Sequence, residues 1–499
     1  MGKLTEKVTK GFFWVLFEKC GVQGVHFIVT LVLARLLLPS DYGTVALLSI
    51  FISISNTFVD CGFGKALVQK KNATQTDMNS VFFLSVAIAL GLYAVLFLGA
   101  PLVAEFYRIP ELTPMMRILS LSLIFHSVNG VQNVELNRKM LFKLSFRISW
   151  VSAIVKAVVG VTMAVLGYGA WALVWASLSG GISGVIARQF VIAWRPTLTF
   201  SWDSLRGLFR FGWKMTVSSL TARIFQDIVG FLIGKIYTRA DLAFYNKGSH
   251  VPNLIVKLVD ATLGRVSFSA LVRLQNNEER LRNALRRMIR CSSFLVCPLM
   301  FVLAVLAKPL VLILYGKNWE PCAVLMVFFC IMRLPRALST VNAQGFLARG
   351  RSDVYLRVVV IRRIIGALTL LCAFHIGLTE YVATVAALSI PLTFLVDAWP
   401  NRKLLGYSFR MQMVDFMPAL LLAAATGGCV YALTVLFPLC VYALVPAGIA
   451  VYFGLYLGMA YLLRMPAMAE FSAALEPRLL VRAPFAVGLA RSIRRRCGK

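Results

Sequence analysis

Three arginines inside apolar stretches are the residues of this sequence with the clearest capacity for ligand chemistry. Arg333 and Arg336 flank Leu334 and Pro335, and Arg223 lies in an earlier apolar stretch. A guanidinium group holds phosphate or carboxylate oxygens through charge-assisted, often paired hydrogen bonds. Ionisable side chains within apolar segments are costly to bury and usually face a cavity or a partner. We therefore predict that these arginines line a cavity for an anionic ligand.

Arg223 has a second interpretation, because Asp227 follows it by four residues. Side chains at this spacing meet on one face of a helix, so the two charges can simply neutralise each other. Arg333 and Arg336 have no acidic residue near them in the sequence, so the same explanation does not extend to them.

Two asparagines in apolar stretches, Asn129 and Asn342, are further candidates for the wall of the cavity. His126, Asn129 and Asn133 are spaced so that they share one face of a helix. Amide groups within a membrane either line a polar cavity or join neighbouring helices by hydrogen bonds. Both interpretations stay open for Asn129 and Asn342.

Four acidic residues are candidates for binding a coupling ion or for gating, namely Glu18, Asp60, Asp227 and Asp260. The ion would be a proton or sodium. Asp60 and Asp260 lie near the ends of their apolar stretches, where bracing of the helix end is the alternative. Cationic residues outnumber these acids inside the apolar stretches. This balance favours an anionic substrate, since an exporter of cations would need an acidic cavity.

The cysteine and histidine patterns predict neither a metal site nor a resident cofactor. The ten cysteines contain no C-x-x-C pair, and the four histidines do not cluster with them. Isolated cysteines of this kind are typical of small apolar packing residues.

The composition is that of an integral membrane protein. Of the 499 residues, 59% are hydrophobic and 15% are charged, and a soluble protein of this size could not remove so much apolar surface from water. The formal net charge of +31 is compatible with nucleic-acid binding. However, Lys and Arg also accumulate in the cytoplasmic loops of membrane proteins, and no soluble basic domain is visible. We therefore predict no nucleic-acid partner.

The hydrophobic pattern predicts an all-α integral membrane fold with about 14 transmembrane helices, each of about 20 apolar residues. The predicted spans are 11–37, 43–65, 80–102, 115–136, 147–167, 170–193, 210–236, 243–264, 291–313, 321–347, 356–376, 380–399, 414–437 and 440–463. If the N-terminus is cytoplasmic, most Lys and Arg fall on the cytoplasmic side, and the even number of spans places both termini there. The first span is too long for a cleavable signal peptide and is expected to stay in the membrane.

The chain is predicted to contain two similar lobes. A shift of roughly 200 residues aligns Asp41 with Asp241 and Asp60 with Asp260, and repeats that run in the same direction are known from transporters. The substrate path is expected between the lobes. The predicted domains are a six-helix lobe (1–194), a cytoplasmic linker (195–209), a second six-helix lobe (210–400), two extra transmembrane helices (401–465) and a basic cytoplasmic tail (466–499).

Segment 273–290 is predicted to be a helix on the membrane surface. Leu274, Leu281 and Leu285 recur at helical spacing, with arginines between them. Basic amphipathic helices of this kind lie beside anionic lipids, so membrane lipids are expected partners.

Several motifs together carry a resemblance to a known family. They are LARLLLPSDYGTVALLSIF (33–51), DCGFGKALVQKKNATQTDMNSVFF (60–83), FRFGWKMTVSSL (209–220), DIVGFLIGKIYTRADLAFYNKG (227–248) and KPLVLILYGKNWEPCAVLM (308–326). As a set they resemble the Wzx-type polysaccharide flippases, in particular the exopolysaccharide exporter branch of the multidrug/oligosaccharidyl-lipid/polysaccharide exporter superfamily. The resemblance covers roughly residues 1–400.

The resemblance implies a transporter rather than an enzyme, with two six-helix lobes, two extra helices and alternating access. It implies that repeat units of a lipopolysaccharide or exopolysaccharide, linked to undecaprenyl pyrophosphate, move from the cytoplasmic to the periplasmic leaflet of the bacterial inner membrane. It also implies polysaccharide polymerase machinery as a partner. Arg223, Arg333 and Arg336 can supply the basic cavity of the family, although no motif assigns them to it.

Three other functions stay open at this stage. One is a drug or small-cation antiporter of the same superfamily. Another is a membrane glycan polymerase or ligase, which would need a catalytic constellation and usually a large outer loop, and neither is visible. The last is a lipid-binding scaffold without transport. The identity of the glycan does not follow from the sequence.

Overall fold

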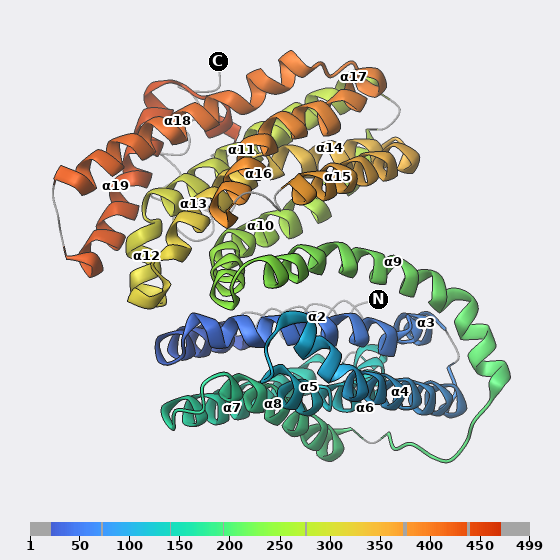
Figure 1. The fold of residues 1–499 in the computed structure, drawn as a ribbon. Coiled ribbons are helices and arrows are strands. Elements are labelled where there is room, and N and C mark those ends of the chain that lie inside the picture. The colour runs from blue at the N-terminus through green and yellow to red at the C-terminus, as the bar shows by residue number, and fades with distance from the viewer. Residues whose placement is uncertain are drawn as a thin grey trace. The chain divides into compact units, whose positions relative to one another are not determined.

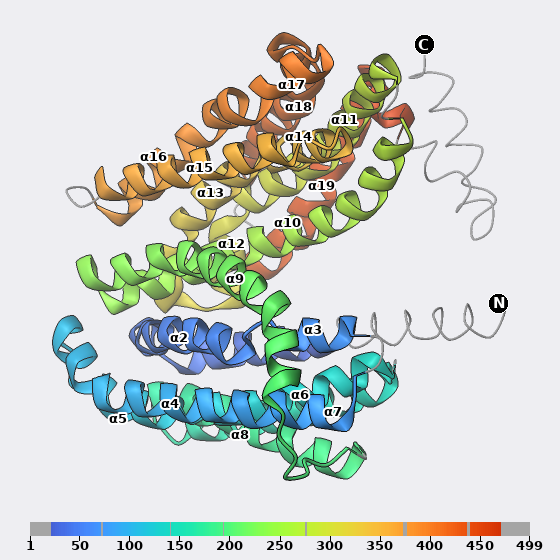
Figure 2. The same ribbon diagram turned by 90° about the vertical axis from the view of Figure 1, so that its right-hand side faces the viewer.

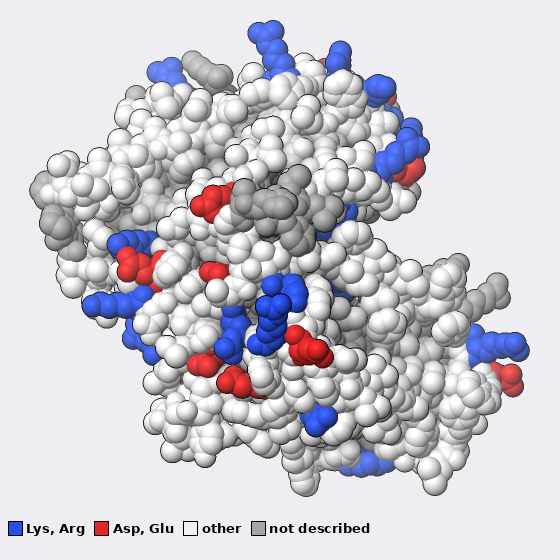
Figure 3. Space-filling model, in the orientation of Figure 1, with Lys and Arg blue, Asp and Glu red and all other residues white. Residues whose placement is uncertain are grey.

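The structure is a computed structural model that describes residues 21–70, 73–139, 141–192, 194–274, 277–372, 377–436 and 440–470. These residues form helices and connecting segments, with no strand among them. Two compact units divide the chain, residues 1–243 and residues 244–499. Large parts of the face shown in Figure 3 carry no Lys, Arg, Asp or Glu, as expected for surfaces that contact lipid.

The helices of the first unit form a bundle around α6. They are the apolar helix Gly21–Leu36, α2 (Pro39–Asp60), α3 (Phe63–Gln69), α4 (Gln75–Tyr107), α5 (Leu112–Leu119), α6 (Ser122–Arg138), α7 (Phe142–Val165), α8 (Ala170–Val191) and α9 (Trp202–Ile236). α2, α4 and α8 all pack against α6, and Figure 1 shows them side by side. α9 bends along its length, as both ribbon views show (Figures 1 and 2).

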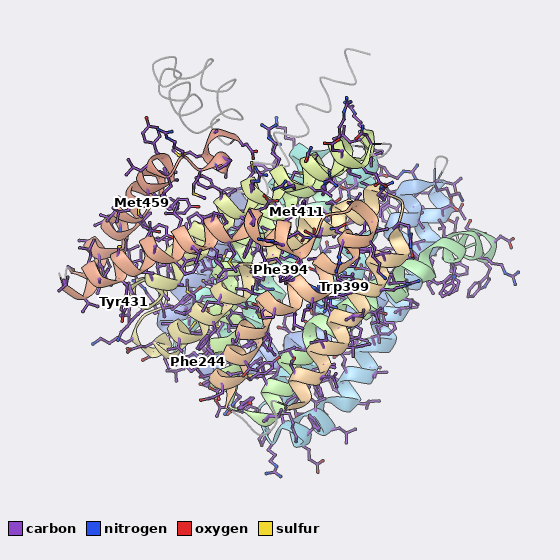
Figure 4. The ribbon with its side chains drawn as sticks, turned by 90° about the horizontal axis from the view of Figure 1, so that it is seen from above. Phe244, Phe394, Trp399, Met411, Tyr431 and Met459 are labelled. Carbon is purple, nitrogen blue, oxygen red and sulfur yellow. The ribbon has the colours of Figure 1, made fainter. Side chains whose placement is uncertain are left out.

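The second unit is organised around α11. Its elements are α10 (Arg239–Arg273, whose first turns belong to the first unit), α11 (Glu278–Val305), α12 (Ala307–Leu314), η1 (Lys317–Trp319), α13 (Pro321–Arg333), α14 (Arg336–Ala348), α15 (Ser352–Cys372), α16 (Leu378–Leu392), the π-helix η3 (Thr393–Ala398), α17 (Trp399–Leu405), α18 (Phe409–Leu436) and α19 (Val441–Leu462). Phe394 lies inside this unit at 4% exposure, whereas Tyr431 lies at its margin at 60% (Figure 4).

Ten of the described helices are long and apolar enough to cross a membrane. They indicate a multi-pass membrane protein, as predicted, but the expected number of 14 is not confirmed. Each of the ten falls on a predicted span. The four predicted spans without such a helix are 11–37, 115–136, 243–264 and 356–376.

The shortfall has physical causes. Span 11–37 begins outside the described residues. Span 115–136 is broken by the turn at Ser120–Leu121 between α5 and α6. α10 and α15 carry several charged residues, including Lys257 and Arg362, which lower the mean hydropathy of these helices.

The boundary between the units differs from the predicted lobe boundary at one helix. The sequence places span 210–236 in the second lobe, whereas α9 lies with the first unit. The reason is a close backbone contact with α2 and α3: a Cβ on Gly62 would lie 2.5 Å from the carbonyl oxygen of Gly212. Gly62 also has φ of +67°, a conformation that favours glycine.

Segment 273–290 is predicted to lie on the membrane surface, and this placement is wrong. From Glu278 onward this segment is the first part of α11, which continues without a break to Val305. Leu281, Leu285 and Ile289 are fully buried. Arg286 and Arg290 both bind Asp415 of α18, at 2.8 and 2.7 Å. The apolar face of this segment therefore packs on protein rather than on lipid.

The two helices α18 and α19 pack within the second unit. α18 runs along α11, and its Asp415 is 2% exposed. The buried Tyr456 of α19 donates a hydrogen bond to the carbonyl oxygen of Phe294 in α11.

Matching hydrogen bonds occur at two repeat-related positions. The backbone N–H of Leu38 donates to Asp41 at 3.0 Å, and that of Thr238 donates to Asp241 at 3.1 Å. Both bonds lie at the start of a helix, α2 and α10, and both helix starts belong to the first unit.

A second pair of repeat-related aspartates, Asp60 of α2 and Asp260 of α10, also bonds to a neighbouring helix. His126 of α6 bonds to Asp60 at 3.0 Å, and Thr340 of α14 donates to Asp260 at 2.6 Å. The internal repeat suggested by the sequence is thus present in the local structure.

Candidate functional site

Three arginines converge on one polar region of the second unit. A cavity of about 200 Å³ is lined by Arg333, Arg336 and Arg362, and an adjoining cavity of about 290 Å³ shares Arg336 and Arg362 with it. Ser339 contributes to both cavities. We refer to the two cavities together as the basic pocket.

The break between α13 and α14 places two of these arginines. α13 ends at Arg333 and α14 begins at Arg336, with Leu334 and Pro335 between them. Proline lacks a backbone N–H and cannot donate the hydrogen bond that would continue the helix. Pro335 therefore interrupts what the sequence predicts as one span, and both arginines border the interruption.

Arg362 of α15 is the best-bound of the three. Its Nε donates to Asp397 Oδ1 at 2.7 Å and its Nη2 to Asp397 Oδ2. The same Nη2 donates to the hydroxyls of Ser339 and Thr393, at 2.8 and 2.9 Å. Asp397 is 3% exposed, so this arginine neutralises a buried carboxylate.

Arg336 and Arg333 are bound less completely. Arg336 donates to Asp260 at 3.1 Å, and its side chain remains 45% exposed. Arg333 is partly buried, and its Nε has no hydrogen-bond partner in the described part of the chain. No described acidic residue lies within ion-pair distance of Arg333.

The basic pocket therefore has an excess of positive charge among its described residues: three guanidinium groups against the carboxylates of Asp260 and Asp397. A partly buried guanidinium without an acidic partner is costly in the free protein. An anion with several oxygens would supply the missing hydrogen bonds, because guanidinium groups pair with phosphate oxygens two at a time.

Sequence reasoning identified Arg333 and Arg336 but missed Arg362 and Asp397. Arg362 lies inside predicted span 356–376 and, as a charged residue within an apolar stretch, was an available signal. Asp397 lies in predicted span 380–399 and was an available signal as well.

Arg223 lies apart from the basic pocket, in the first unit. It donates to Asp227 at 2.7 Å and to Ser53 at 2.9 Å, and Ser53 donates to Asp227 at 2.5 Å. These contacts fit the interpretation in which Arg223 and Asp227 neutralise each other.

The two asparagines lie at helix contacts. Asn342 is 0% exposed, donates to Gln412 at 2.9 Å and accepts from Asn401 at 2.7 Å, as a hydrogen-bonded helix contact requires. Asn129 accepts a hydrogen bond from Arg188 of α8 at 3.0 Å.

The candidate coupling residues are dispersed. Asp60 lies beside a cavity of about 700 Å³ in the first unit, together with His126. Asp260 lies in the basic pocket of the second unit. Asp227 is held by Arg223, and Glu18 lies outside the described residues. Ion coupling by any of them stays a prediction.

Comparison with known proteins adds independent information. Residues 32–324 match a family profile described as polysaccharide biosynthesis protein. The chain is 29% identical to the succinoglycan biosynthesis transport protein ExoT of Rhizobium meliloti, over 62% of this chain and 63% of that protein. It is 22% identical to the lipopolysaccharide biosynthesis protein WzxC of Escherichia coli, over 85% and 88% of the two chains.

Among solved structures, the lipid II flippase MurJ in an inward closed conformation is similar in fold. The TM-score is 0.69 at 13% identity, with 91% of this chain and 98% of that chain covered. The ExoT match leaves more than a third of that relative unmatched.

Proposed function

Because the chain belongs to the polysaccharide biosynthesis protein family, whose profile covers residues 32–324, we propose that it is a flippase for a lipid-linked glycan. The resemblance to Wzx-type proteins expected from the sequence is confirmed at the family level. The proposed substrate is a polysaccharide repeat unit carried on undecaprenyl pyrophosphate, moved from the cytoplasmic to the periplasmic leaflet.

One observation carries this proposal, namely the basic pocket with its incompletely bound arginines. A pyrophosphate group has the charge and the oxygen atoms to complete the hydrogen bonds of Arg333 and Arg336. The hydroxyls of Ser339 and Thr393 accept from Arg362 and donate to backbone carbonyl oxygens, so the hydrogen bonds to the anion would come from the arginines. A cation exporter would instead require a carboxylate-rich pocket.

In the proposed mechanism the chain performs no covalent chemistry. The barrier to flipping is the transfer of a charged, hydroxyl-rich head group through hydrocarbon, which is very costly without compensating bonds. The basic pocket would hold the head group while the polyprenyl tail stays in lipid. Alternating access would then expose the head group to the other side.

Two further parts of the proposal concern the cellular setting. We place the protein in the bacterial inner membrane with both termini in the cytoplasm, on the distribution of Lys and Arg along the sequence. Polysaccharide polymerase machinery would consume the flipped product. A proton or sodium gradient would drive the cycle.

The proposal is tested by following transbilayer movement of the substrate. Lipid-linked repeat unit accumulated by a deletion strain is reconstituted into vesicles with the purified chain, and a membrane-impermeant glycosidase is added outside. We expect the protein to make nearly all of the substrate accessible, whereas about half stays protected in protein-free vesicles because the leaflets do not exchange.

The variant Arg333→Ala/Arg336→Ala should leave the inner half protected while the protein still inserts. Arg351→Ala is the matched control, because Arg351 is exposed and pairs with Asp353 outside the basic pocket. Full accessibility with the double variant, or only about half accessibility with the wild type, would refute the proposal.

A further inference from the structure

The first unit contains a larger cavity of a different chemical character. Its volume is about 700 Å³, within the range of sites that bind drug-sized ligands. The walls come from α2, α3, α4, α6 and α9, all within the first unit. The side chains that can bond a ligand are Asp60, Ser85, Asn133, Asn137, Thr216 and Ser219.

Among the polar side chains that line this cavity, neutral hydrogen-bonding groups outnumber ionisable ones. None of the described lining residues is Lys or Arg, and Asp60 and His126 are the two ionisable residues in that lining. The carboxylate of Asp60 would repel an anion. The described lining of this cavity therefore suits an uncharged polar ligand, in contrast to the basic pocket.

Several of these groups retain unused bonding capacity. Arg188 donates to Asn133 Oδ1 at 3.1 Å, and because a guanidinium only donates, the amide nitrogen of Asn133 must point elsewhere. His126 occupies Oδ1 of Asp60, whose side chain is 62% exposed. Thr216 donates to the carbonyl oxygen of Gly212 and keeps its oxygen lone pairs. The cavity thus offers both donors and acceptors.

Apolar groups complete the lining. Val59, Val81, Val131 and Val134 lie in the wall, and Gly130 opens space, because a Cβ there would meet no atom within 4 Å. Sugar rings combine hydroxyls, each able to donate and accept, with C–H faces that pack on apolar surface. The mixture in this cavity matches that chemistry.

We propose that the cavity of the first unit binds uncharged, hydroxyl-rich sugar rings, so that glycan recognition and pyrophosphate binding occupy separate pockets. This proposal rests on the proposed function for the identity of the glycan. Its own argument is the amide, hydroxyl and carboxylate lining around Asn133.

The glycine at position 130 permits a direct test. Gly130→Leu would fill the cavity without a backbone clash, since no atom lies within 4 Å of the added Cβ. Gly91→Leu is the matched control: Gly91 is an exposed helical glycine in the same unit, and its Cβ would also meet nothing. Both variants should fold, and thermal unfolding of the purified chains checks this.

Two soluble probes are titrated calorimetrically into the full-length chain in detergent. The first is the lipid-free oligosaccharide released from the accumulated repeat unit, and the second is inorganic pyrophosphate. We expect Gly130→Leu to weaken oligosaccharide binding more than tenfold and to leave pyrophosphate binding unchanged. Gly91→Leu should bind both probes as the wild type does.

A second variant tests a single lining group. Asn137 is exposed and lines the cavity, so Asn137→Ala should remove one ligand bond and weaken oligosaccharide binding about fivefold to tenfold. Unchanged oligosaccharide affinity in both Gly130→Leu and Asn137→Ala would overturn the proposal, as would the absence of oligosaccharide binding by the wild type. Loss of oligosaccharide binding in Gly130→Leu supports the sugar-binding proposal, whether or not the wild type binds pyrophosphate. Absence of pyrophosphate binding by the wild type would count against the proposed function instead.

Discussion

Arg333 shows how an incompletely bound cation marks a site. The acidic residues of the basic pocket are engaged by its other two arginines, Asp397 by Arg362 and Asp260 by Arg336. Arg333 shares the same pocket and has a buried Nε without a partner in the described chain. Arg362 thus holds the pocket together, while Arg333 and Arg336 remain available to a ligand.

This division of roles predicts different consequences for the arginines. Arg362→Met should leave Asp397 buried and unpaired, and we expect a loss of about 2–3 kcal/mol in the free energy of unfolding. This loss is small for the removal of one partner of a buried ion pair, because the Arg362 side chain is one-third exposed. Midpoints of thermal unfolding in one detergent measure the effect.

The double variant Arg362→Met/Asp397→Leu provides the control, because it removes both charges together. It should recover most of the lost stability. If the double variant is as unstable as the single one, the unpaired carboxylate of Asp397 is not the cause of the lower stability of Arg362→Met.

The sequence predicts some of these residues and not others for a clear reason. Arg333 and Arg336 stand out because they lie in an apolar stretch without a nearby acid. Their partner Asp260 is 76 residues from Arg336, so the pairing depends on tertiary contacts. The same holds for Asn342, whose partners Asn401 and Gln412 decide that it is a buried helix contact.

At the scale of elements, α11 shows that an amphipathic sequence pattern predicts a helix but not the surface against which its apolar face packs. Leucines alternating with arginines are compatible with a lipid surface or with a protein partner that supplies carboxylates. Asp415 of α18 supplies them here, accepting from Arg286, Arg290 and the hydroxyl of Tyr407. The pattern predicted the helix correctly, but a one-dimensional sequence does not show which surface covers it.

The α11–α18 contact gives a second stability prediction. Asp415→Ala removes the shared acceptor of Arg286, Arg290 and Tyr407 at a site where Asp415 is buried. We expect a loss of about 3 kcal/mol. The measurement is chemical or thermal unfolding of the purified chain.

Asp353→Ala is the comparison variant, because Asp353 is exposed and its pair with Arg351 lies on the surface. Exposed pairs contribute about 0–1 kcal/mol. Equal destabilisation by the two substitutions would show that the Asp415 contacts do not hold α18 on α11.

The contact of α9 with the α2–α3 turn gives a third prediction. Gly62→Ala places a Cβ 2.5 Å from the carbonyl oxygen of Gly212 and forces a side chain into a positive φ. The strain alone costs about 1–3 kcal/mol, and the clash adds to it. A lower unfolding midpoint is the expected result.

Gly64→Ala is the comparison variant, because it adds the same methyl group two residues further on, away from Gly212. An added Cβ at Gly64 would only meet Val134 at 3.6 Å, an ordinary contact. This variant should keep the wild-type midpoint. A wild-type midpoint for Gly62→Ala as well would show that the close approach of the two backbones is not needed.

At the scale of the whole molecule, the repeat accounts for the layout of the chain. Repeat-related aspartates, Asp41 and Asp241, bond at the starts of α2 and α10, and the related pair Asp60 and Asp260 bonds to α6 and α14. The same bonding framework thus recurs along the chain. The pockets built on that framework differ, with neutral amides and hydroxyls in the first unit and arginines in the second.

Much of this layout was predictable, since apolar length and the repeated aspartates are sequence properties. Ten predicted spans coincide with apolar helices long enough to cross a membrane. The breaks at Ser120–Leu121 and at Pro335 were not predicted, because hydropathy averages over a window and does not register a local turn. The break at Pro335 lies between Arg333 and Arg336, which both line the basic pocket.

The central claim is that the arginines of the basic pocket bind pyrophosphate, and equilibrium binding of inorganic pyrophosphate to the purified full-length chain tests it most directly. We predict saturable binding that weakens at high salt and falls at least tenfold in Arg333→Ala/Arg336→Ala, but not in the surface variant Arg351→Ala. Wild-type affinity in the double variant would contradict the claim.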